Sequence, residues 1–155
     1  MTGRGVIRLV LLGFVVVALG VFMVRESGNK ETDAADAVQA AAHGRQVTVY
    51  YFHRTARCAT CLKIEELSKN SVMANFADEL KRGDLVFKSV NVETGGNEHF
   101  VDDYQLVSQA LVLVDYRDGV QEKWKNLDQV WDLVHTDDAF NAYVRDEVRT
   151  FLATI

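Results

Sequence analysis

The chain contains no proline, and it has no excess of basic residues. From Glu31 onward, 13 Lys and Arg stand against 21 Asp and Glu, a formal charge of −8. Because no basic stripe is available to neutralise phosphates, nucleic acid is excluded as an expected partner. Of the 155 residues, 48% are apolar and 25% are charged, which is typical of a folded domain rather than a disordered or fibrous chain. This length leaves no room for a second globular domain.

Cysteine is nearly absent as well, and the only two cysteines, Cys58 and Cys61, stand two residues apart. They follow the apolar and β-branched stretch Val47–His53, which has the composition of a strand buried on both faces. A helical spacing of apolar residues begins after them. This position, at a strand-to-helix junction, indicates a dithiol and makes redox chemistry the leading hypothesis.

The neighbours of the pair suggest a role for each thiol. The pKa of a free cysteine is about 8.5, and it falls at a helix N-terminus or beside cations. Arg57 is adjacent to Cys58, and Arg54 and His53 are close in sequence. We therefore expect Arg57, Arg54 and His53 to favour the thiolate of Cys58 and make it the attacking thiol. Cys61, one turn into the helix, is expected to be more buried and to resolve the mixed disulfide.

Other roles for the two cysteines are open. A structural disulfide is one, although a ring this small stabilises a fold by only about 2 kcal/mol, against nearly 5 kcal/mol for a long loop. Two inert buried thiols are another. A zinc site would need a second ligand pair, and the histidines show no metal-binding spacing, so no structural metal is expected. A non-catalytic module that binds a thiophilic metal, a metalloid or a partner subunit through the dithiol is the alternative function.

The first part of the chain has the pattern of a membrane anchor. Residues 6–24 are apolar apart from Arg8, and as a helix they would span about 28 Å, close to the hydrocarbon thickness of a bilayer. A cleaved signal peptide is the rival interpretation, but no convincing small-x-small cleavage site follows. We expect an uncleaved anchor over residues 1–26, a tether over 27–46, and a folded domain over 47–155 on the extracytoplasmic side of the cytoplasmic membrane.

The remaining chain alternates between strand and helix patterns and then gives a hairpin and a last helix. The turn Arg117-Asp118-Gly119 indicates the hairpin. Strands separated by helices imply an α/β fold with a mixed sheet and helices on both faces. The expected strands are 47–53, 85–92, 110–116 and 120–125, and the expected helices are 58–81 with a break near Asn70-Ser71, 98–104, and 137–152.

This order, with the dithiol opening the first long helix, resembles the thioredoxin-like fold over residues 46–155. The resemblance is carried by the apolar strand, by Cys58-x-x-Cys61 and by the later strand with Tyr116-Arg117-Asp118-Gly119, and it implies a mixed four-stranded sheet. YYFHRTARCATC and KWKNLDQVW (Lys123–Trp131) are similar to a small bacterial thioredoxin-like family labelled as a nitrophenyl-compound nitroreductase subunit. Nothing in the chain resembles a flavin or nicotinamide site, so no cofactor is expected.

One departure from the family concerns the loop opposite the dithiol. Thioredoxin-like enzymes have a cis-proline there, which presents backbone to the partner and keeps metals off the dithiol. The corresponding residues here are Ser108, Gln109 and Ala110, and we expect this substrate-facing loop to be trans, because a non-proline cis bond costs about 2.5 to 4 kcal/mol. The resemblance implies a thiol-disulfide oxidoreductase that acts on a protein or small-molecule thiol or disulfide. The apolar run of residues 6–24 predicts that this oxidoreductase is anchored in the membrane.

Overall fold

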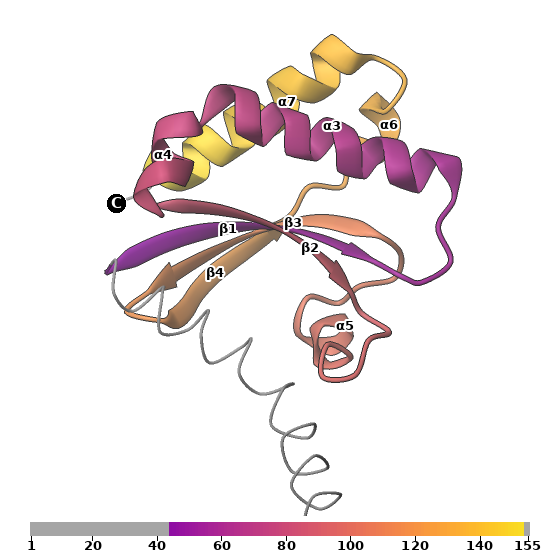
Figure 1. Ribbon diagram of the computed structural model, residues 1–155, viewed down its shortest axis with the longest axis horizontal. Helices are drawn as coiled ribbons and strands as arrows, with labels where there is room; N and C mark the ends of the chain where they lie inside the picture. The colour runs from indigo at the N-terminus through magenta and orange to yellow at the C-terminus, as the bar shows by residue number, and fades with distance from the viewer. Residues whose placement is uncertain (1–43, 154–155) are drawn as a thin grey trace, which may run out of the picture. The chain divides into compact units, whose positions relative to one another are not determined.

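The computed structural model describes residues 44–153, so the expected anchor over residues 1–26 and most of the expected tether lie outside the described residues. Among the helices described, none has the length and apolar character needed to cross a bilayer. The elements are β1 (Arg45–His53), α3 (Ala59–Asn75), α4 (Ala77–Arg82), β2 (Leu85–Asn91), α5 (His99–Asp103), β3 (Ala110–Arg117), β4 (Val120–Asn126), α6 (Val130–Leu133) and α7 (Asp137–Ala153) (Figure 1).

Strand β1 lies in the interior of a four-stranded sheet with the order β2-β1-β3-β4. It is parallel to β2, with a register that runs from Val47 opposite Leu85 to His53 opposite Asn91. It is antiparallel to β3. All residues between its two ends are buried. Burial on both faces explains the nearly continuous run of apolar and β-branched side chains in this strand. The sheet is mixed, as the sequence predicted.

Helices lie on both faces of the sheet. Figure 1 shows α3, α4, α6 and α7 over one face and α5 against the other. The face under α3 and α7 holds the larger core, which includes Val49, Ile64 and Phe140. The second core, toward α5, is rich in aromatic rings, with Phe52 stacked on Tyr50 at 5.1 Å between ring centroids. The expected α/β architecture, a mixed four-stranded sheet between helices, is confirmed.

The break in the first long helix falls later in the chain than predicted. Helix α3 continues through Asn70 and Ser71, so the expected break there is wrong. The Ser71 hydroxyl does not interrupt the helix because it donates to Oδ1 of Asn141 in α7 at 2.8 Å. The chain turns instead at Phe76, whose φ of −134° and ψ of 37° leave the helical region and whose ring is buried. The expected end at Gly83 is confirmed, with a φ of 82° that caps α4.

Strands β3 and β4 form the antiparallel hairpin that the sequence predicted. Its turn has Asp118 at a φ of 51° and Gly119 at a φ of 80°. Two successive left-handed residues suit a tight hairpin turn, because their twist matches that of the flanking strands. The Asp118 N–H also donates to the carbonyl of Gly44 at 3.0 Å, so the turn holds the chain where it enters β1.

Arg45, at the start of β1, connects the sheet with the end of α7. Its Nε donates to Oδ1 of Asp115 at 2.9 Å, and the Asp115 side chain is 1% exposed. Its two other nitrogens donate to the carbonyls of Leu152 at 2.8 Å and Phe151 at 2.7 Å. The last carbonyls of a helix have no partner within the helix. One cation therefore neutralises a buried carboxylate and satisfies the helix end.

Replacing Arg45 with methionine is expected to lower the free energy of unfolding by about 3 kcal/mol, because Asp115 would stay buried without its closest cation. The matched variant Arg117→Met alters an exposed arginine that lies 3.9 Å from Asp115, and it should cost about 1 kcal/mol or less. Urea unfolding followed by circular dichroism measures both losses. Equal losses would contradict the assignment of Arg45 as the main partner of Asp115.

Candidate redox site

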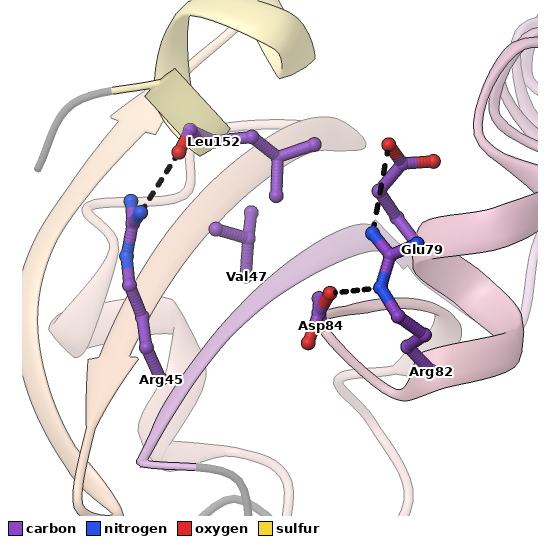
Figure 2. Close-up of a pocket in the computed structure, with 6 residues that line it drawn as sticks. All are labelled: Arg45, Val47, Glu79, Arg82, Asp84 and Leu152. Carbon is purple, nitrogen blue, oxygen red and sulfur yellow. Dashed lines mark hydrogen bonds and ion pairs between the residues drawn. The ribbon is translucent and has the colours of Figure 1, made fainter.

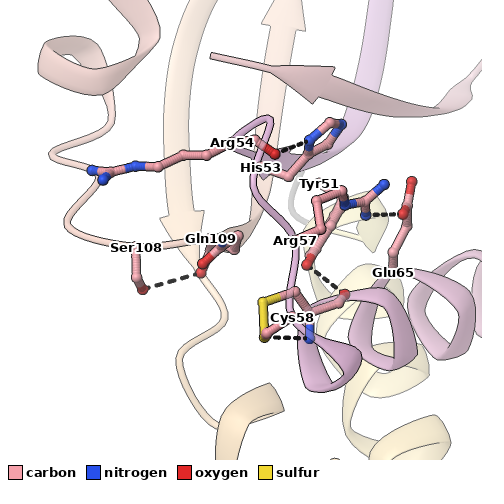
Figure 3. The surroundings of a disulfide bond; sticks show 9 residues. Tyr51, His53, Arg54, Arg57, Cys58, Glu65, Ser108 and Gln109 are labelled. Atoms are coloured by element: carbon pink, nitrogen blue, oxygen red, sulfur yellow. Dashed lines mark hydrogen bonds and ion pairs between the residues drawn. A yellow bond between two sulfur atoms is a disulfide. The ribbon is translucent and has the colours of Figure 1, made fainter. Parts of the chain in front are cut away.

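A disulfide joins Cys58 and Cys61 at the start of α3, and their Cα atoms are 5.0 Å apart (Figure 3). Cys58 is the N-cap residue of the helix, and its Sγ accepts a hydrogen bond from the Cys61 N–H at 3.1 Å. The first turn of α3 contains no acidic residue. The predicted position at a strand-to-helix junction is confirmed, and the Cys58 sulfur lies at the positive end of the helix dipole.

The two cysteines differ in accessibility. Cys58 is exposed, whereas Cys61 is 3% exposed. The buried cysteine is fixed in place by Tyr51, whose hydroxyl donates to the Cys61 carbonyl at 2.7 Å. The expected burial order is therefore observed. A thiol or disulfide in solvent reaches the sulfur of Cys58 first.

The loop before β3 lies at the same end of the sheet as the disulfide. Ala110 pairs with Phe52, next to the last residue of β1, so residues 107–109 adjoin the segment that leads to the dithiol. Figure 3 shows Ser108 and Gln109 beside the segment that leads from β1 to the disulfide. The Ser108 hydroxyl donates to the Gln109 carbonyl at 3.2 Å. No peptide bond within residues 44–153 is cis. The prediction of a trans loop is thus confirmed.

His53 is the last residue of β1, and Arg54 follows it in the segment that leads to the disulfide. Nδ1 of His53 donates to the Arg54 carbonyl at 2.9 Å, and the imidazole stacks on the ring of Tyr51 at 6.2 Å between centroids. Arg54 is exposed, and its side chain extends away from the disulfide (Figure 3). Both residues are in the approach to the dithiol. Their effect on the Cys58 thiolate stays a prediction.

Arg57 belongs to a network that the sequence did not reveal. It donates to Oε2 of Glu65, one turn beyond Cys61 (Figure 3). The other oxygen of this carboxylate accepts from the Ser89 hydroxyl. The guanidinium also lies over the ring of Tyr51, with Cζ 5.8 Å from the centroid. No sequence spacing could connect Glu65 with Ser89, because Ser89 comes near only when β2 pairs with β1 and places it opposite Tyr51.

Two groups of this network have shifted pKa values. Burial raises the pKa of Tyr51 to about 12, and the nearby Arg57 cation reduces this shift without cancelling it. Burial also opposes the ionisation of Glu65, but hydrogen bonds from Ser89 and Arg57 outweigh it and hold the pKa of Glu65 below its usual value. Near neutral pH the network therefore contains a neutral phenol, a carboxylate and a guanidinium.

A second set of polar contacts holds the loop of residues 54–57 against the last residue of β2 and the segment that follows it. The Thr55 N–H donates to Oε2 of Glu93 at 3.0 Å. The Thr55 hydroxyl accepts from Nδ2 of Asn91, also at 3.0 Å. The sequence did not predict these contacts either. Together with the Arg57–Glu65 pair, they fix the short segment that carries the chain from the sheet to the dithiol.

A cavity of about 320 Å³ lies at the other end of β1 (Figure 2) and shares no residue with the redox site. Its arginines are already engaged, Arg45 with Asp115 at 2.9 Å and Arg82 with Asp84 at 2.7 Å. Within residues 44–153, no group of three or more His, Cys, Asp or Glu side chains is placed to hold a metal ion. The cavity is lined by Arg45, Val47, Glu79, Arg82, Asp84 and Leu152.

The solved structures that are similar to this chain include two thioredoxin-like proteins. Trxlp from Edwardsiella tarda is 19% identical, with 72% of this chain and 92% of that chain covered and a TM-score of 0.43. Thioredoxin O2 from Arabidopsis thaliana, in its oxidised state, is 20% identical, with 72% and 89% covered and a TM-score of 0.42. No family model and no curated protein matches the sequence, so the closer likeness to the nitroreductase-subunit family is not confirmed.

The raised pKa of Tyr51 predicts a loss of stability in alkali. The unfolded phenol ionises near pH 10.0 and the folded one near 12, so the unfolded state binds fewer protons in this window and stability falls as the pH rises. At pH 11 the contribution of Tyr51 should be about 1 kcal/mol smaller than at pH 9. Urea unfolding at the two pH values measures the fall, which Tyr51→Phe should reduce. An unchanged fall in Tyr51→Phe would contradict the prediction.

Proposed function

We propose that this protein is a membrane-anchored thiol-disulfide oxidoreductase that works through Cys58 and Cys61. The observation that carries the proposal is the position of Cys58, an exposed residue at the N-cap of α3 whose sulfur is bonded to a buried partner, Cys61. A disulfide ring of this size stabilises a fold by only about 2 kcal/mol. Its place at an exposed helix start suits exchange chemistry better than a stabilising role.

The exchange proceeds in two steps. When the protein acts as an oxidant, a substrate thiolate attacks Sγ of Cys58, the Cys58–Cys61 bond breaks, and Cys61 leaves as a thiolate that takes up a proton. A second substrate thiolate then attacks the substrate sulfur of the mixed disulfide, and Cys58 leaves. The substrate loses two electrons and two protons and becomes a disulfide, while the protein becomes a dithiol. Reduction of a substrate disulfide runs through the same steps in reverse.

The local structure favours negative charge on Cys58. Its Sγ already accepts the Cys61 N–H, and a thiolate there would strengthen this hydrogen bond because the acceptor is charged. The helix dipole acts in the same direction, and no acidic side chain in the first turn of α3 opposes it. Cys61 is buried and within bonding distance of Cys58, so its thiolate can attack a mixed disulfide on Cys58 without competition from thiols in solvent.

Two large apolar side chains are exposed, one next to Cys61 in the sequence and one just before the loop opposite the dithiol, and they support a protein or small-molecule thiol as the substrate. Leu62 follows Cys61 and is 49% exposed, and Val107 precedes the loop of Ser108 and Gln109 and is 90% exposed. In this proposal the loop contacts the partner through serine and glutamine instead of proline.

Cys58→Ser is expected to abolish exchange, whereas Cys61→Ser should accumulate a mixed disulfide on Cys58, because the resolving thiol is lost. The full-length protein is assayed for reduction of a model disulfide and for oxidation of a dithiol peptide, and the trapped adduct is identified by mass spectrometry. Full activity of Cys58→Ser would overturn the proposal. Retention of a soft metal ion by a reduced protein that exchanges no disulfide would favour a thiophilic binding module.

The proposal includes attachment to the cytoplasmic membrane through residues 6–24, with the redox domain outside the cytoplasm. The support is the apolar sequence of this segment. Removing residues 1–26 is expected to move the protein from the membrane fraction to the soluble fraction. Fractionation followed by immunoblotting measures this shift, and protease accessibility in spheroplasts tests the side of the membrane. Membrane retention of the truncated protein would contradict the assigned anchor.

A further inference from the structure

The cation closest in sequence to the reactive sulfur is paired with a carboxylate. Arg57 precedes Cys58 directly, yet its guanidinium forms an ion pair with Glu65 on the second turn of α3. The side chains of both residues are 22% exposed, so bulk water screens this pair less than a fully exposed one. The positive charge beside the dithiol is therefore balanced by a negative one.

Glu65 is held in this position from two elements. One oxygen accepts from Arg57 in the loop before α3, and the other accepts from the Ser89 hydroxyl in β2. The Arg57 side chain is restricted in turn by the ring of Tyr51 at 5.8 Å. Its Nε is buried and has no hydrogen-bond partner among the described residues. The ion pair with Glu65 is thus the main interaction that offsets the free-energy cost of partly burying the Arg57 guanidinium.

We propose that Glu65 sets the reduction potential of the Cys58–Cys61 pair by holding Arg57 and neutralising it. This role rests on the proposed function, and it makes Glu65 a positioning residue that acts through Arg57. With Glu65 in place, the Arg57 guanidinium is held in an ion pair with the Glu65 carboxylate. Without it, the cation is free to stabilise the Cys58 thiolate, which favours the dithiol over the disulfide.

The test is the equilibrium of the full-length protein with glutathione, together with the thiolate absorbance of the reduced protein as the pH is varied. Glu65→Gln is expected to shift the equilibrium constant toward the dithiol by about tenfold, which corresponds to a potential about 30 mV higher, and to lower the pKa of Cys58. Glu66→Gln is the matched control, because Glu66 is the exposed next residue of the same helix. It should change the equilibrium constant by less than about twofold.

A double-mutant cycle separates an effect through Arg57 from a simple loss of negative charge. In the Arg57→Gln background, Glu65→Gln should change the equilibrium constant by less than half as much, on a logarithmic scale, as it does in the natural chain. Glu65→Asp keeps the charge but shortens the side chain, so it should shift the potential in the same direction as Glu65→Gln. An equal effect of Glu65→Gln in both backgrounds, or an equal effect of Glu66→Gln, would overturn the proposal.

The outcomes also separate this inference from the proposed function. If the natural chain exchanges disulfides but its potential is unchanged by Glu65→Gln, the role of Glu65 is wrong and the oxidoreductase proposal stands. If the natural chain exchanges no disulfide, the oxidoreductase proposal is wrong. In that case the pKa of Cys58, which the thiolate absorbance of the chemically reduced protein measures without any exchange, still reports whether Glu65 acts on the dithiol. Circular dichroism of each variant establishes that the fold is retained.

Discussion

Strand β1 is hydrogen-bonded along both of its edges, and the rest of the structure depends on this. Its parallel partner β2 and its antiparallel partner β3 leave it no free edge, while α3 and α7 pack on one of its faces and α5 on the other. A strand confined in this way has little freedom to shift its register, because a slip of one residue would exchange its two faces. The chain therefore leaves the sheet at His53 in one direction, toward the dithiol.

The same pairing assembles the surroundings of the disulfide. β2 brings Ser89 opposite Tyr51, and β3 brings Ala110 opposite Phe52, so side chains far apart in sequence converge on one end of the sheet. Helix α3 adds Glu65, which lies one turn beyond the buried cysteine. Two opposite effects meet there. The helix N-terminus favours negative charge on Cys58, while Arg57, the cation next to Cys58 in the sequence, is paired with Glu65.

The local signals in the sequence predicted most elements of the fold. The buried strand, the cap at Gly83 and the Asp118-Gly119 turn follow from side-chain periodicity and backbone preference, which act over a few residues. The helix break near Ser71 was wrong for a tertiary reason. Polar residues within a helix commonly signal an end, but here Ser71 bonds to Asn141 of α7, and no local pattern reveals that a distant helix supplies the partner.

For the dithiol, spacing and position in the sequence predicted the helix start, the exposed Cys58 and the buried Cys61, because each depends on the residues next to it. The electrostatic surroundings of the dithiol could not be predicted from the sequence, because a guanidinium pairs with whichever carboxylate the tertiary packing brings near it. Sequence proximity made Arg57 a neighbour of Cys58, whereas the pairing of β1 with β2 and the packing of α3 gave it Glu65 as a partner. Neighbours along the chain thus define the cysteine pair and its place at the helix start, and contacts between distant segments set the charges around it.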